Sequence, residues 1–133
     1  MNKKGFTLVE LLAIIVILGI IITIVYPLVV STINDAKKNA YTSQKEIVIK
    51  AAKLYYLDHV ENLPDIGSSE NRCVTIETLI TDGYISSEEL KSNYSMIKEE
   101  KKLINPDNNT EISSVQVKYE NNKYVYNLVE SCS

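Results

Sequence analysis

The stretch KKGFTLVELLAIIVILGIIITIVYPLVV, residues 3–30, decides the fold of this chain. After two lysines and a glycine, an apolar run extends from Leu11 to Val30 with few interruptions. As a helix, residues 6–30 would be about 37 Å long, enough to span a bilayer core of about 30 Å. Glu10 lies at the start of this segment, where an ionised carboxylate costs several kcal/mol unless it finds a partner. The sequence therefore predicts a membrane-spanning helix with a functional acid near its start.

The leader indicates how Glu10 acquires a partner. A secretory signal has its cleavage site after the apolar core, whereas here the small residue Gly5 precedes the core and residues 31–33 (STI) follow it. Cleavage between Gly5 and Phe6 would leave the whole apolar helix attached and create an amine on Phe6. This cation, near Glu10 in the chain, could pair with the carboxylate within one chain or between neighbouring chains.

Residues 3–10, KKGFTLVE, resemble the leader and first helical turn of type IV pilins and their pseudopilin relatives. The resemblance implies a processing site at Lys4, Gly5 and Phe6. There a prepilin peptidase would cut after Gly5 and methylate the Phe6 amine. It also implies that Glu10 pairs with the Phe6 amine of a neighbouring subunit during assembly.

Two residues within the apolar run predict local distortion of the helix. Pro27 removes one helical hydrogen bond and should kink a helix that continues past it. Gly19 and Pro27 also lie where helices of the pilin family carry helix-breaking residues. The resemblance implies that the stretch between them can lose its helical hydrogen bonds and extend in an assembled filament.

The helix is expected to continue through residues 31–60 and to end at residues 62–64 (NLP). Apolar residues three or four positions apart mark one face with a polar gap at Gln44, namely Ile33, Ala36, Ala40, Ile47, Ala51 and Leu54. A helix from residue 6 to residue 60 would be about 80 Å long. The remaining residues are too few to cover it, so its first half must be buried by lipid or by copies of itself.

Residues 61–133 are expected to form a small head. A short helix is predicted between Thr75 as N-cap and Gly83 as its left-handed stop. Residues 86–89 (SSEE) have the spacing of a capping box for another short turn. Residues 73–86 are similar to the segment that follows the long helix in many pilins of Gram-positive bacteria, where it bridges helix and sheet.

The clearest strands come last. Alternating apolar residues predict a β-hairpin around the turn at residues 120–123, with Val115, Val117 and Tyr119 on one strand and Tyr124, Tyr126 and Leu128 on the other. A short strand is also expected near residues 103–104. The prediction is an α+β fold in which a long N-terminal helix packs on a small antiparallel sheet, as in the type IV pilin fold.

Cys73 and Cys132 are the two cysteines of the chain. If the head lies outside the membrane, a disulfide is the natural interpretation, worth roughly 4 kcal/mol in the chain-entropy model. The alternative is two unpaired thiols. A metal site is not expected, because His59 and two cysteines do not make a ligand set. Residues 107–111 (DNNTE) could be offered as a calcium loop, but the EF-hand spacing is absent and a solvated turn is the simpler interpretation.

The charge is uneven along the chain. The formal net charge is −3, and residues 61–133 carry −6, from 7 basic against 13 acidic side chains. An acidic head argues against a broad nucleic-acid surface. The sequence contains no nucleophile and base at useful spacing, no glycine-rich phosphate loop and no paired carboxylates. No catalytic residue and no cofactor are therefore predicted.

These observations predict a structural subunit of a type IV pilus or pilus-like filament. Two alternatives stay open: a pseudopilin of a DNA-uptake or type II-like secretion machine, and a signal-anchored extracellular binding module that does not polymerise. The predicted segments are a leader at residues 1–5, an assembly helix at 6–30, an amphipathic helix at 31–60 and a head at 61–133.

The expected partners are copies of the chain, the prepilin peptidase, the inner-membrane assembly platform with minor pilins, and membrane lipid before assembly. Lys3 and Lys4 fit a cytoplasmic N-terminus under the positive-inside rule. The precursor is then expected in the cell membrane as a single-pass protein, and the assembled filament outside the cell.

Overall fold

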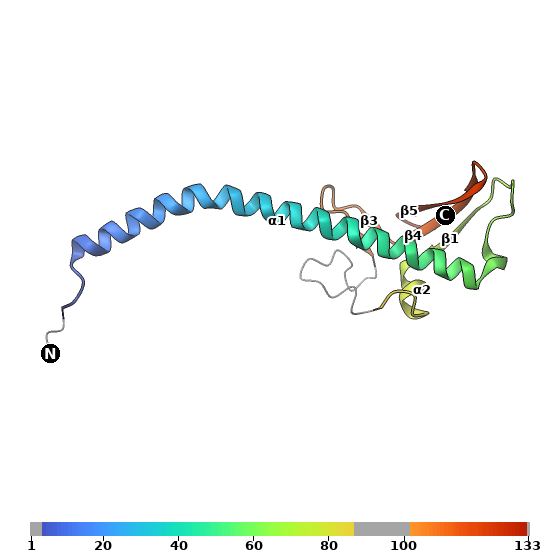
Figure 1. Ribbon diagram of the computed structural model, residues 1–133, viewed down its shortest axis with the longest axis horizontal. Coiled ribbons are helices and arrows are strands. Elements are labelled where there is room, and N and C mark those ends of the chain that lie inside the picture. The colour runs from blue at the N-terminus through green and yellow to red at the C-terminus, as the bar shows by residue number, and fades with distance from the viewer. Residues whose placement is uncertain (1–3, 87–101, 133) are drawn as a thin grey trace. The chain divides into compact units, whose positions relative to one another are not determined.

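The computed structural model describes residues 4–86 and 102–132. The chain divides into two compact units, Met1–Asp35 and Ala36–Ser133. One helix, α1 (Leu8–Asp58), contributes residues to both units (Figure 1). The long helix predicted from the sequence is confirmed, and it begins and ends two residues inside the expected bounds.

The first unit consists of residues 8–35 of α1, called here its apolar section, and the residues before them. The helix continues without interruption through Gly19 and Pro27. Two threonine hydroxyls are satisfied inside the helix: Thr23 donates to the Gly19 carbonyl at 2.8 Å and Thr32 to the Leu28 carbonyl at 3.0 Å. The predicted loss of helix between Gly19 and Pro27 concerned an assembled filament and stays a prediction.

The second unit contains residues 36–58 of α1, called here its second section. This section packs on the head through one stripe of side chains. The buried members are Gln44, Val48, Ala51, Ala52 and Tyr56. The predicted face was wrong in part, since Leu54 is exposed and Gln44, expected as a gap, is buried. The observed stripe is turned by roughly a quarter of the helix circumference, at about 100° per residue. It follows an i, i+4 row in which small Ala52 lies between the larger Val48 and Tyr56.

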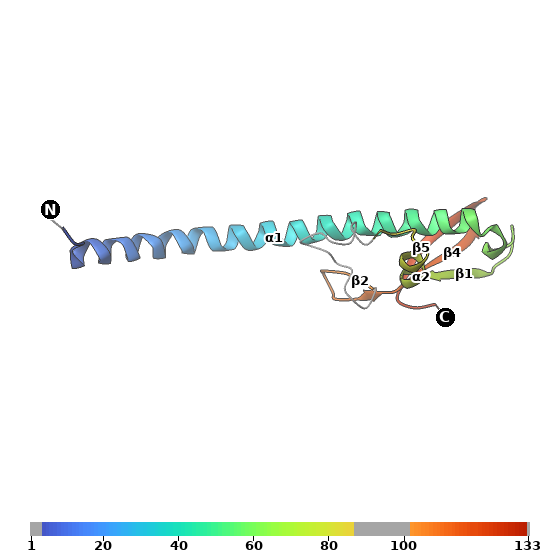
Figure 2. The ribbon, with the colours of Figure 1, turned by 90° about the horizontal axis from the view of Figure 1, so that it is seen from below.

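A three-stranded antiparallel sheet supplies the other half of this core. Its order is β1 (Asn71–Thr75), β4 (Ser114–Glu120) and β5 (Lys123–Val129), and Figure 2 shows it along one side of the second section of α1. The predicted hairpin is confirmed, and Asn121 and Asn122 make its turn with φ of 51° and 65°. Strand β1 was not predicted. Val74, Val115 and Val117 are the sheet's buried apolar side chains.

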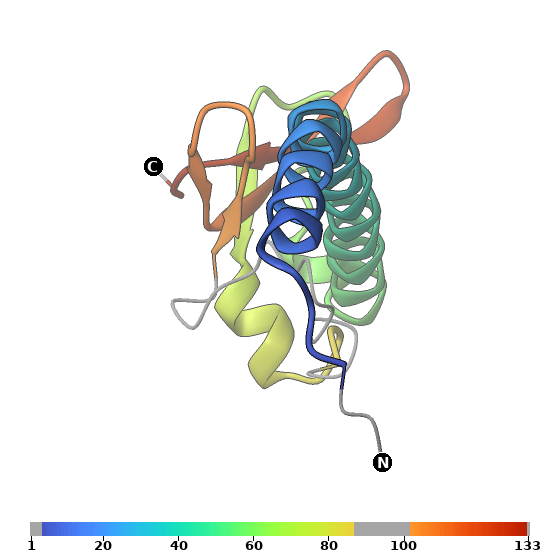
Figure 3. The same cartoon turned by 90° about the vertical axis from the view of Figure 1, so that its left-hand side faces the viewer.

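Helix α2 (Ile76–Thr81) follows β1 directly, as Figure 3 shows. The predicted N-cap is confirmed, because Thr75 Oγ1 accepts a hydrogen bond from the Thr78 amide at 3.1 Å. Gly83 has a φ of 81°, as its predicted role as a left-handed stop requires. Tyr84 then donates its hydroxyl to the Asp58 carboxylate at 2.8 Å, which ties the end of α1 to the turn after α2.

Shorter elements complete the head. A 3-10 helix, η1 (Val60–Asn62), follows α1, and β2 (Leu103–Ile104) pairs antiparallel with β3 (Glu111–Ile112). The strand predicted at residues 103–104 is therefore confirmed. The capping box predicted at residues 86–89 lies mostly outside the described residues.

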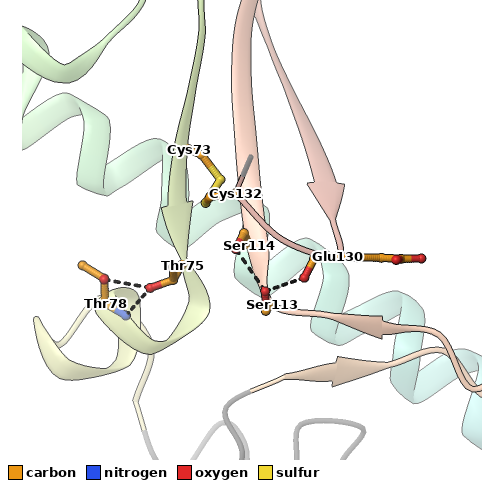
Figure 4. Close-up of a disulfide and its surroundings, with 7 residues drawn as sticks. All are labelled: Cys73, Thr75, Thr78, Ser113, Ser114, Glu130 and Cys132. Carbon is orange, nitrogen blue, oxygen red and sulfur yellow. Dashed lines mark hydrogen bonds between the residues drawn. A yellow bond between two sulfur atoms is a disulfide. The ribbon is translucent and has the colours of Figure 1, made fainter.

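The predicted disulfide between Cys73 and Cys132 is confirmed (Figure 4). It joins β1 to the segment after β5, with the two Cα atoms 5.8 Å apart. Beside it, the Ser113 hydroxyl donates to the Glu130 carbonyl, so the same C-terminal segment is held at a second point. The disulfide thus closes most of the head into one covalent loop.

Candidate functional site

The predicted processing site lies immediately before α1. Residues 4–7 have no regular secondary structure, and Gly5 and Phe6 are both exposed. The peptide bond between them is therefore outside the helix, where no helical hydrogen bond protects it. Cleavage after Gly5 itself stays a prediction.

A reciprocal capping box begins the helix. The Thr7 amide and the Thr7 hydroxyl both donate to Glu10 Oε2, at 2.8 Å and 3.0 Å. The Glu10 amide in turn donates to Thr7 Oγ1 at 3.3 Å. Thr7 and Glu10 thus satisfy polar groups that the first turn of any helix leaves without intrahelical partners.

The box also fixes where the carboxylate lies. Glu10 folds back toward the N-terminal end of α1, where the helix dipole favours a negative charge. No described residue donates a hydrogen bond to its second oxygen, Oε1. Gly5 precedes Phe6 in the described chain, so the Phe6 nitrogen is an amide, and the predicted pairing of Phe6 with Glu10 stays a prediction.

The apolar section of α1 is exposed on every side. Between Leu11 and Val30, the exposed fraction of the large apolar side chains runs from 39% at Val30 to 71% at Ile24 and Leu28. Among the described helices, α1 is the one long and apolar enough to cross a membrane. A helix that is hydrophobic all round needs lipid or other helices about it.

Gly19 and Pro27 lie within this exposed section. A Cβ atom added at Gly19 would meet nothing within 4 Å, so no contact with the part of the chain that the structure describes requires a glycine there. Small residues allow helices in membranes to approach closely. Gly19 would therefore allow another helix to approach this part of α1 closely.

The turn considered as a calcium loop has a different arrangement. Its two acids form ion pairs with lysines. Asp107 Oδ1 lies 3.2 Å from Lys38 Nζ, and Glu111 Oε2 lies 2.9 Å from Lys102 Nζ. The Asn105 and Asn108 side chains accept hydrogen bonds from backbone amides two residues on. Within residues 4–86 and 102–132, no three His, Cys, Asp or Glu side chains are grouped so that they could hold a metal ion.

Sequence reasoning placed Glu10 at the site but missed Thr7. The signal was present, because Thr7-Leu8-Val9-Glu10 has the Ser/Thr-x-x-Glu spacing of a capping box. The apolar residues on both sides are typical of a membrane segment, and the capping pattern within them was therefore overlooked. The carboxylate consequently has a partner within the first turn of its own helix.

Comparison with known families supports the resemblance of the N-terminal residues to those of type IV pilins. Residues 1–26 match the family described as the prokaryotic N-terminal methylation motif. No curated protein and no solved structure matches the chain. The match does not reach residues 73–86, whose likeness to Gram-positive pilins stays a prediction. The chain therefore carries, in its first 26 residues, the methylation motif of type IV pilin-like proteins.

Proposed function

We propose that this protein is a structural subunit of a type IV pilus or pilus-like filament. The precursor is held in the cell membrane by the apolar section of α1, with its leader in the cytoplasm. A prepilin peptidase cuts after Gly5 and methylates Phe6. The mature subunit then polymerises through its N-terminal helix, with the help of an assembly platform and minor pilins, and the filament lies outside the cell.

One observation carries the proposal: the apolar section of α1, which overlaps the methylation motif, has its large apolar side chains exposed and no packing partner among the described residues. Lipid covers this surface before assembly, and like helices cover it afterwards. Because lipid and a helix bundle are similarly apolar, burial alone gives little preference for the bundle. Close packing and a specific charge pair must therefore set the register of one copy on the next.

Glu10 supplies the negative half of that pair. Its Oε2 is held by Thr7 and its Oε1 faces no described donor, so a neighbour's Phe6 amine can approach without breaking the capping box. Thr7 acts as a positioning residue in this scheme. It also reduces the cost of the carboxylate in the membrane before the amine arrives.

Replacing the acid tests the proposal. Glu10→Ala should leave membrane insertion of the chain unchanged and reduce sheared filaments to background, because the neighbour's amine loses its counter-charge. Glu46→Ala, which removes an exposed acid from the second section of α1, is the matched control and should retain filaments. Filaments at wild-type yield from Glu10→Ala would contradict the charge pair, and a wild-type chain that makes no filament would favour an anchored binding module.

A further inference from the structure

The head contains a groove that the assembly helix does not explain. It lies between the second section of α1 and the strands β3 and β5, and its volume is about 350 Å³. Its walls combine aromatic and aliphatic side chains with one cation, including Tyr41, Lys45, Ile49, Tyr126 and Leu128. Such mixed concave surfaces suit an apolar side chain accompanied by a negative charge.

Two lysines give the groove a positive rim. Lys45 Nζ lies 5.5 Å from the centre of the Tyr41 ring, and Lys53 Nζ lies 5.7 Å from the centre of the Tyr126 ring. Cation–π contacts of this kind hold a long side chain over an aromatic face. The two positive charges are therefore kept beside the groove.

A second part of the head, outside the groove, presents a complementary feature. Ile66 has an exposed fraction of 76%, the highest among the large apolar side chains described between residues 36 and 132. It lies in a tight turn in which the Ser68 amide donates to the Asp65 carbonyl at 3.0 Å and Gly67 has a φ of 84°. This turn, residues 65–68, displays an isoleucine beside an exposed acid.

We propose that the groove of one copy receives the turn at residues 65–68 of a second copy. Ile66 would enter between the aliphatic and aromatic walls, and Asp65 would meet Lys45 and Lys53. This inference rests on the proposed function, for which it names a contact between heads.

The distribution of charge favours a second copy as the occupant. Residues 36–58 of α1 carry five lysines against two acids, whereas the described head residues outside α1 carry nine acids against four basic side chains. Unlike charges on two surfaces of the same molecule attract copies to one another and set their orientation.

The positions of the two features determine what such a contact builds. Lys45 and the helix end at Asp58 are separated by about 20 Å at about 1.5 Å per residue, and the turn lies beyond that end. A contact between two different surfaces of one unit is heterologous, so it leaves a free groove and a free turn after each addition. Heterologous contacts that do not close generate open helical filaments.

The first test removes the apolar part of the contact in the full-length chain. Ile66→Asp should reduce the yield of sheared filaments at least about tenfold, as expected for an anchor residue at an interface centre. Leu57→Asp is the matched control, because Leu57 is 69% exposed but lies outside the groove. It should stay within about twofold of wild type. Exported protein and intact disulfide, measured on non-reducing gels, show that each variant folds.

The second test exchanges the charges. Lys45→Glu and Asp65→Lys should each reduce filament yield severalfold, because each brings like charges together. The double variant should yield more filaments than either single variant, since the Lys45–Asp65 pair is restored in reverse while Lys53 is unchanged. Lys50→Glu, an equal charge reversal at an exposed position outside the groove, should have little effect.

The outcomes separate this inference from the proposed function. Wild-type yield from Ile66→Asp, or a double variant no better than its parents, would overturn the contact between heads. If Glu10→Ala still abolished filaments in that case, the proposed function would stand alone. A wild-type chain that forms no filaments would overturn both.

Discussion

The two sections of α1 differ in how their side chains are covered, although they belong to one helix. Before residue 36, large apolar side chains are exposed on all sides. After it, Val48, Ala52 and Tyr56 are buried against the sheet in a single stripe. Each section is helical, but among the described residues only the second finds packing partners.

This difference separates what stabilises the two sections. The head section depends on contacts that exist in a single folded copy, so substitutions there should change the free energy of unfolding. Under the proposed function the apolar section is covered by lipid or neighbouring copies, so substitutions there should change insertion and assembly.

Removal of the disulfide should give the largest change in stability. The Cys73→Ser/Cys132→Ser variant should lose about 4 kcal/mol, because the bond closes a loop with a sequence separation of 59. Urea unfolding of the full chain in detergent micelles, followed by tyrosine fluorescence, measures this loss. Membrane insertion should be unchanged, and a defect in insertion would contradict the separation of the two sections.

A pair of valines makes a finer comparison within α1. Val48→Ala removes two methyl groups from a fully buried position and should destabilise the head by about 2 kcal/mol. Val29→Ala, at a half-exposed position in the apolar section, should leave the same unfolding curve unchanged. Equal losses from the two variants would show that the apolar section also packs within one copy.

The two threonine caps provide a smaller contrast. Thr75→Ala should lower the stability of the head by about 1 kcal/mol, because α2 belongs to the core. Thr7→Ala should leave the stability of the head unchanged and only speed amide exchange in the first turn of α1. Hydrogen exchange on the full chain in micelles distinguishes these results, and Thr7→Ser should restore slow exchange.

Alkaline pH should lower the stability of the head, because folding buries tyrosine side chains there. Burial raises the pKa of Tyr56 to about 12. The folded state therefore favours the neutral phenol of Tyr56 over the phenolate. The stabilisation that comes from this preference is fully present below about pH 10 and is lost as the pH rises to about 12. Tyr56→Phe should flatten this decline in a series of thermal melts. The decline should not vanish, since burial also raises the pKa of Tyr41 and Tyr126.

Local signals in the sequence were sufficient for much of the fold. The hairpin turn at Asn121 and Asn122, the cap at Thr75 and the stop at Gly83 depend on neighbouring residues, and all three are confirmed. Strand β1 was missed because its five residues, NRCVT, have little apolar alternation of their own. It becomes a strand through its pairing with β4, which a local pattern does not reveal.

The buried face of α1 likewise depends on tertiary contacts that a local sequence pattern does not reveal. Ile, Val, Leu and Ala residues occur on several sides of residues 36–58, so periodicity allowed more than one stripe. Docking of the sheet selected the stripe through Val48, Ala52 and Tyr56 and drew Gln44 into the core. At the N-terminus, Glu10 was predicted from its unusual surroundings, whereas its capping partner Thr7 was overlooked.

The mass of the polypeptide recovered from sheared filaments tests the central claim most directly. The account predicts filaments built from this chain, with each subunit beginning at an N-methylated Phe6 and lacking residues 1–5. A polypeptide that still begins at Met1 would contradict it, because no Phe6 amine would exist to pair with Glu10. The exposed apolar section of α1 would then serve as a membrane anchor only.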